Sequence, residues 1–140
     1  MSETTSANGT LEQVEGELRD EHQSLRDLVG RIREASDVAG IAPLLEELHA
    51  TLHAHFSREE YPGGFYDRLG ALKPEYRKQI RDLVDDHYRI LARLRALTQL
   101  GRTGPPEVAE EVVRDGKAIG DWLADHEKRE HALARQAREG

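Results

Sequence analysis

The chain has 140 residues, which is enough for one domain with a sizeable core and too short for two ordinary domains. It contains no cysteine, which excludes disulfides and thiolate metal ligands and is consistent with the reducing cytoplasm. The formal net charge of −7 disfavours nucleic-acid binding, and no apolar run approaches the length that spans a membrane, so we expect neither a nucleic acid nor a membrane as partner.

The composition favours helices. Ala, Glu, Lys, Leu and Arg together supply about half of the residues, a share typical of long helices. Residues 1–9 are small and polar without periodicity, and they predict a disordered tail before a single domain over residues 10–140.

The five prolines separate stretches with an apolar residue every three or four positions, the pattern of amphipathic helices. Short connections (SDVAG and GRTGPP) favour antiparallel neighbours. A longer segment over residues 61–73 contains Pro62-Gly63-Gly64 and predicts a looped crossover with about one helical turn. The sequence therefore predicts an all-α, up-down-up-down four-helix bundle, with helices over residues 11–36, 41–60, 74–100 and 106–137.

Each predicted helix carries one histidine on its apolar stripe, and two helices also carry a carboxylate there. This follows from the rotation of about 100° per residue in an α-helix. On the same wheels, His49, His53 and His131 fall at the edge of the stripe or beyond it, and this favours a structural role over metal binding for them. The inward residues are the candidate metal ligands: His22, His55, Glu59, His87, His126 and Glu130.

The spacing of these residues points to a metal site. His55 and Glu59, and likewise His126 and Glu130, are one turn apart on one face, so each pair can hold the same ion or adjacent ions. A lone inward histidine is more often a hydrogen-bonded core residue. Buried carboxylates, however, cost several kcal/mol each without a partner, and the stripes offer no lysine or arginine near them.

The ligand types narrow the metal. Imidazole and carboxylate without sulfur suit iron, manganese or zinc. Six candidate ligands exceed what one tetrahedral zinc needs, and two carboxylates that can bridge favour a dinuclear centre. The ferritin-like di-iron pattern fits less well, because only Glu46-x-x-His49 has its spacing.

The axial positions agree for one pair of helices and disagree for the other. His22 lies as far before Ser36 as His55 lies after Ile41, so these two histidines meet across a short loop. By contrast, His87 lies much closer to the predicted helix end at position 100 than His126 lies to the connection at Pro105. The predicted ends therefore do not bring His87 and His126 level.

The order His22, His55-Phe56-x-x-Glu59-Glu60, Asp86-His87 and His126-x3-Glu130 forms a pattern over about residues 11–137. This pattern resembles the hemerythrin-like, or HHE cation-binding, domain family. The resemblance implies a four-helix bundle around a non-heme di-iron centre with an oxo or hydroxo bridge. Its terminal ligands would be His22, His55, His87 and His126, and its bridging carboxylates Glu59 and Glu130.

Two positions depart from oxygen-carrying hemerythrins. Those proteins have two histidines one turn apart on the third helix, whereas His87 is flanked by Leu83 and Leu91. They also have an aspartate at the fifth position after the last histidine, where this chain has His131, preceded by Glu130. A centre with one fewer protein ligand leaves an extra open coordination position, which disfavours simple reversible oxygen carriage and favours water, peroxide or another small ligand at iron.

We therefore expect a di-iron protein that binds or senses dioxygen or related small oxidants. The alternatives are a peroxide-consuming enzyme of catalase or peroxidase type and an iron-handling or metal-responsive module without turnover. Zinc or manganese could replace iron at the same ligands. The oligomeric state, and an extra ligand role for His131, stay open at this point.

Overall fold

A computed structural model describes the backbone of residues 3–139 and, within it, the side chains of residues 12, 16 and 18–139. The short helix α3 (Phe65–Leu72) and two 3-10 turns, at Pro74–Tyr76 and Pro106–Val108, lie between longer elements. No strand occurs in the described part of the chain. The four long helices are α1 (Glu3–Glu34), α2 (Val38–Glu60), α4 (Arg77–Thr103) and α5 (Ala109–Glu139).

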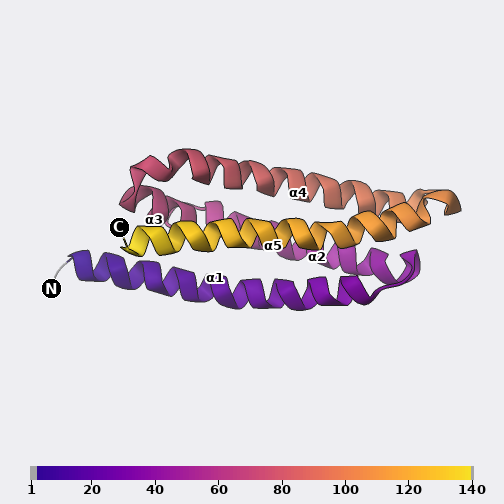
Figure 1. The fold of residues 1–140 in the computed structure, drawn as a ribbon, viewed down its shortest axis with the longest axis horizontal. Coiled ribbons are helices and arrows are strands. Elements are labelled where there is room, and N and C mark those ends of the chain that lie inside the picture. The colour runs from indigo at the N-terminus through magenta and orange to yellow at the C-terminus, as the bar shows by residue number, and fades with distance from the viewer. Residues whose placement is uncertain (1–2, 140) are drawn as a thin grey trace.

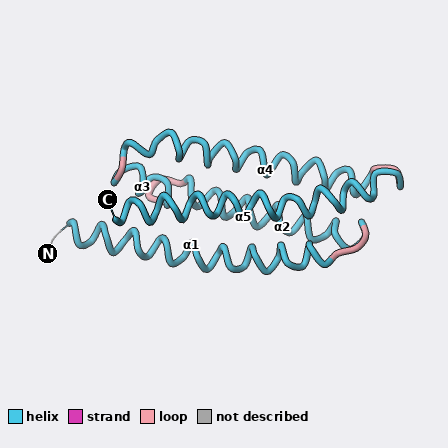
Figure 2. The backbone as a smooth tube through the Cα atoms, viewed as in Figure 1, coloured by secondary structure: helices cyan, strands magenta, loops and turns pink. Residues whose placement is uncertain are grey.

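The long helices alternate in direction along the bundle (Figure 1). The start of α1 and the end of α5 lie at the same end as α3, and only short loops connect the helices (Figure 2). This arrangement confirms the predicted all-α, up-down-up-down four-helix bundle. No helix among the described residues is long and apolar enough to cross a membrane.

Several element bounds differ from those predicted. The crossover contains the short helix α3, about two turns where one was expected. Helix α1 already begins at Glu3. Residues 1 and 2 lie outside the described residues, and the disordered tail over residues 1–9 stays a prediction.

The true ends of α4 and α5 remove the axial mismatch between their histidines. Because α4 continues to Thr103 and α5 begins at Ala109, His87 lies almost as far before the end of α4 as His126 lies after the start of α5. The two histidines are therefore level in the bundle.

Two apolar clusters fill the interior and leave a polar layer between them. The larger cluster fills the half of the bundle away from α3 and includes Leu25, Phe56, Ile90 and Leu123. The smaller cluster lies beneath α3. Its buried members are Leu18, Phe65, Tyr66, Leu69, Leu83, Leu133 and Ala134. In sequence, the inward histidines lie between residues of the two clusters on α1, α4 and α5, which places them in the polar layer.

Candidate metal centre

All six residues predicted as ligands lie in this polar layer, and none is more than 2 % exposed. Each of the four long helices supplies one histidine, and α2 and α5 each add a glutamate one turn further on. The structure therefore brings the predicted set together, while its role in metal binding stays a proposal.

The inward atoms form two overlapping groups of four. The histidines of α1 and α2 form one group with Glu59 and Glu130, and the histidines of α4 and α5 form the other with the same two carboxylates. Within each group the potential ligand atoms lie within 4.8 Å of one another. Each carboxylate contacts one histidine in each of the two groups. From carboxylate oxygen to Nε2, Glu59 lies 3.4 Å from His55 and 3.2 Å from His87. Glu130 lies 3.3 Å from His22 and 3.6 Å from His126.

The opposite ring nitrogen, Nδ1, of each histidine bonds to a side chain of another helix, and these links form a closed ring around the bundle. Three partners are carboxylates, which accept the Nδ1 proton and so leave the Nε2 lone pair facing inward, the form in which imidazole binds metals. The four links are Glu21 to His55 (2.6 Å), Glu60 to His87 (2.8 Å), Asp86 to His126 (3.2 Å) and His131 to His22 (3.1 Å).

Arginines hold two of these outer carboxylates from the surface: Arg58 pairs with Glu21, and Arg129 pairs with Asp86. Burial alone would raise the pKa of both carboxyls. The hydrogen bonds and charges of the arginines and of the bonded histidines outweigh burial and lower both pKa values below their usual range. Both carboxylates are therefore ionised at neutral pH and fix the orientation of the rings they bond.

The two inner carboxyls cannot both ionise easily without a cation. Burial, followed by the charge of Glu130, raises the pKa of Glu59 well above its usual value. Burial also opposes ionisation of Glu130, but the nearby Glu59, His126 and His22 outweigh it and lower the pKa of Glu130 well below its usual value. In the metal-free protein one proton is therefore held by the pair, on Glu59.

The donor set fits a pair of metal ions. His22 Nε2, both side-chain oxygens of Glu59 and Oε1 of Glu130 are buried without a hydrogen-bond partner. The Nε2 atoms of His87 and His126 lie 3.0 Å apart, within hydrogen-bond distance of each other. The buried residues that the structure describes include no lysine or arginine. Bound cations would satisfy these orphaned atoms, which are otherwise costly to bury.

Tyr66 also reaches the centre, and the sequence analysis did not predict it. Its hydroxyl donates to Glu130 Oε2 at 2.6 Å and lies 2.8 Å from His87 Nε2. Helix α3 holds it there because Phe65 and Leu69 pack into the smaller apolar cluster. Burial, followed by the charge of Glu130, raises the pKa of Tyr66 well above its usual value, so the hydroxyl stays protonated.

Sequence reasoning also missed the carboxylates of the outer ring. A signal was present, since Glu21, Glu60 and Asp86 are each adjacent in sequence to a predicted ligand. His131 lies in the same outer position, bonded to His22. His49 and His53 are not in either group of inward ligands, and their rings lie 6.5 Å apart along a groove between α2 and α4.

The family model of the hemerythrin HHE cation-binding domain matches residues 14–134, which include every residue of the centre. The chain belongs to the hemerythrin HHE cation-binding family. Comparisons with curated proteins and with solved structures returned no match. Membership in this family implies cation binding, and the buried His/Glu groups give the hemerythrin domain a site compatible with it.

Proposed function

We propose that this chain is a dinuclear non-heme iron protein that binds or senses dioxygen or a related small oxidant. The observation that carries the proposal is the pair of four-ligand groups that share both carboxylates. Two separate mononuclear sites would have no need of the same two glutamates, whereas bridging carboxylates serve two ions at once.

The proposal of iron rests on ligand chemistry. Four imidazoles and two carboxylates without sulfur suit iron, and the same donors accept zinc or manganese. In the proposed centre, His22 and His55 would hold one ion and His87 and His126 would hold the other, and both ions would share Glu59 and Glu130. The absence of cysteine is consistent with function in the reducing cytoplasm.

Bound iron would supply the electrons that a small oxidant accepts, and the protein residues would control geometry and protons. Glu21, Glu60 and Asp86 fix the ring tautomers, so that all three rings present the lone pair of Nε2. The Tyr66 hydroxyl offers a proton at the edge of the site. The apolar clusters on both sides limit the access of bulk water.

The test is metal analysis combined with visible spectroscopy. Protein purified from iron-replete cells should contain two iron ions per chain and show an absorption band that forms with oxygen and disappears on degassing. Fewer than two ions per chain under these conditions would refute the dinuclear proposal. A centre with two iron ions but no response to oxygen or peroxide would indicate the iron-handling alternative instead.

The second candidate is an enzyme that consumes hydrogen peroxide, and the position of Tyr66 favours it. Disproportionation of two peroxide molecules gives dioxygen and two waters, and it requires proton transfer between the oxygens. A protonated hydroxyl 2.8 Å from His87 Nε2 and 2.6 Å from Glu130 is placed to take part. Oxygen evolution from peroxide by the iron-loaded protein, slowed about tenfold or more in Tyr66→Phe, would support this candidate.

A further inference from the structure

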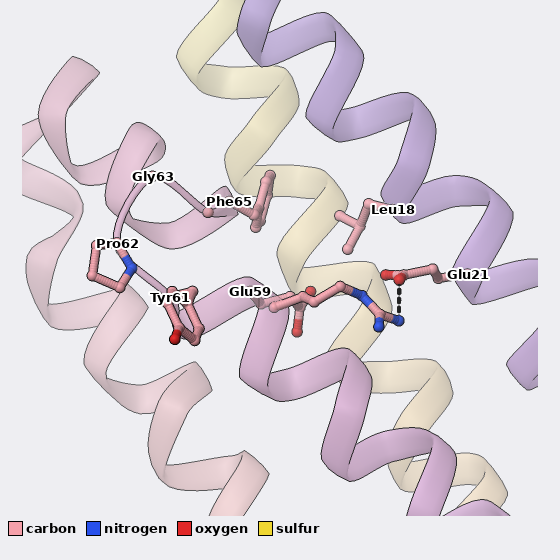
Figure 3. A pocket seen from close by; sticks show the side chains of 9 residues that line it. Leu18, Glu21, Glu59, Tyr61, Pro62, Gly63 and Phe65 are labelled. Carbon is pink, nitrogen blue, oxygen red and sulfur yellow. Dashed lines mark ion pairs between the residues drawn. The ribbon is translucent and has the colours of Figure 1, made fainter.

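A cavity of about 310 Å³ lies beside the proposed centre, where α1 meets the turn between α2 and α3 (Figure 3). Its floor includes Glu59, one of the two shared carboxylates. The walls come from two stretches that are far apart in sequence, one in α1 and one that runs from the end of α2 to the start of α3. They consist of Leu18 and Glu21 of α1, Arg58 of α2, the turn of residues 61–64, and Phe65 of α3.

The wall on the side of the turn depends on two glycines. Gly63 has a φ of +83°, a conformation that other residues rarely adopt. At Gly64 an added Cβ would lie 2.3 Å from the carbonyl oxygen of Arg58. The tight turn therefore follows directly after α2 ends at Glu60, and its residues 61–64 form a wall of the cavity beside Glu59.

The residues that line the cavity range from exposed to buried. At its outer side, Tyr61 is 69 % exposed and the Arg58 side chain is 60 % exposed. At its inner side, both carboxylate oxygens of Glu59 are buried. The ion pair between Arg58 and Glu21 joins α2 to α1 at the cavity, as the dashed line at Glu21 shows in Figure 3.

Two other surface pockets do not border the proposed centre. The groove that contains His49 and His53 and the pocket that contains Arg129 include none of the six candidate ligands in their linings. Arg129 is nevertheless chemically comparable to Arg58, because each pairs with the outer carboxylate of a centre histidine. It therefore provides a matched control.

We propose that this cavity is the entry site through which small neutral or anionic ligands reach the dinuclear centre, and that the Arg58–Glu21 ion pair controls their passage. This inference rests on the proposed function, since it assigns the route to the same centre. The volume admits molecules of a few non-hydrogen atoms with room to spare. Leu18 and Phe65 form an apolar wall that suits dioxygen, and Glu21 offsets the charge of Arg58.

The ion pair is suited to frequent opening. Exposed arginine–carboxylate pairs are weak, so the guanidinium can leave Glu21 at small cost. Glu21 keeps its bond to His55 when Arg58 moves away, so opening leaves the ring of outer links intact. Loss of either arginine removes support from an outer carboxylate, so an effect of that loss on the centre itself should appear in both Arg58→Ala and Arg129→Ala, and a change in entry rate that only Arg58→Ala shows reports passage through the cavity.

The experiment measures azide binding to the iron-loaded protein by stopped-flow absorption, with iron content determined for each variant. Arg58→Ala should raise the association and dissociation rates together, by about two- to fivefold, and leave the dissociation constant unchanged, because a residue at the entrance affects passage in both directions. Arg129→Ala should leave both rates within a factor of two of the wild-type values. Leu18→Phe, which narrows the cavity, should slow both rates.

Equal azide rates in wild-type, Arg58→Ala and Leu18→Phe proteins that each contain two iron ions would overturn the entry site while leaving the proposed centre intact. A change in the dissociation constant of Arg58→Ala without a change in association rate would also overturn it, because Arg58 would then act on the bound ligand. Wild-type protein with fewer than two iron ions would overturn the entry site and the proposed function together.

Discussion

Glu130 and His131 are adjacent on α5, and exchanging each for alanine tests the architecture of the centre. Glu130 is fully buried and belongs to both groups of candidate ligands. His131 is half-buried, belongs to neither group, and bonds the outer nitrogen of His22. The geometry therefore predicts opposite outcomes for neighbouring positions.

The expected magnitudes follow from the number of ligands. Glu130→Ala leaves three of four protein ligands in each group and removes one negative charge between the ions. Mutation of a residue that hydrogen-bonds a ligand typically weakens metal binding by about 10- to 100-fold. Glu130 would itself be a ligand, so its loss should weaken the binding of both ions by more than about 100-fold. His131→Ala should weaken the binding of only the ion held by His22, by about tenfold, so the protein should still bind both ions at micromolar iron.

The assay is iron per chain after desalting, together with the visible spectrum. Glu127→Ala provides the control, because Glu127 is also a buried carboxylate on α5 but belongs to neither ligand group. We expect at most one iron ion in Glu130→Ala and two in both His131→Ala and Glu127→Ala. Full loading of Glu130→Ala, combined with metal loss in His131→Ala, would refute the placement of the inward ligands.

Three further outcomes are expected. Chelation of the metal should lower the melting temperature by about 8–16 °C, because a free metal concentration of about 1,000 times the dissociation constant adds about 4 kcal/mol to the free energy of unfolding. An unchanged calorimetric transition would contradict a metal-coupled core. In the metal-free protein, burial and the neighbouring His126 lower the pKa of His87 to about 3. The folded state then binds fewer protons than the unfolded state between pH 6.5 and 3, so His87 should destabilise the protein by about 2 kcal/mol as the pH falls from 7 to 5. The raised pKa of Glu59 acts in the opposite direction, because it stabilises the folded protein at low pH and this stabilisation is lost as the pH rises. The measurement is therefore the difference in the free energy of urea unfolding between wild type and His87→Leu at each pH. Equal pH dependence in the two proteins would be evidence against the lowered pKa of His87. Tyr66→Phe should cost the metal-free protein about 1.5–3 kcal/mol of unfolding free energy, because it removes a buried hydrogen bond to the Glu130 carboxylate; a stability equal to wild type would show that this bond does not form.

The sequence alone was sufficient for the fold and for the six polar residues that face inward. A helix repeats every 3.6 residues, so apolar spacing within each segment identifies the face that packs inward. His55 and Glu59 were assigned to that face from their own helix, with no knowledge of its neighbours. The bundle followed from four such faces and short connections, because antiparallel packing is the compact way to bury them.

The tertiary structure decided how the helices meet, and this determined the rest of the site. Glu21 bonds His55 and Asp86 bonds His126 because the helices are rotated and shifted so that these side chains face each other, and no pattern within one helix records that relation. Tyr66 reaches Glu130 because α3 folds under the end of the bundle, where a loop with one helical turn was expected. Contacts between residues far apart in sequence depend on the relative placement of whole elements, and only the packed core of the bundle fixes that placement.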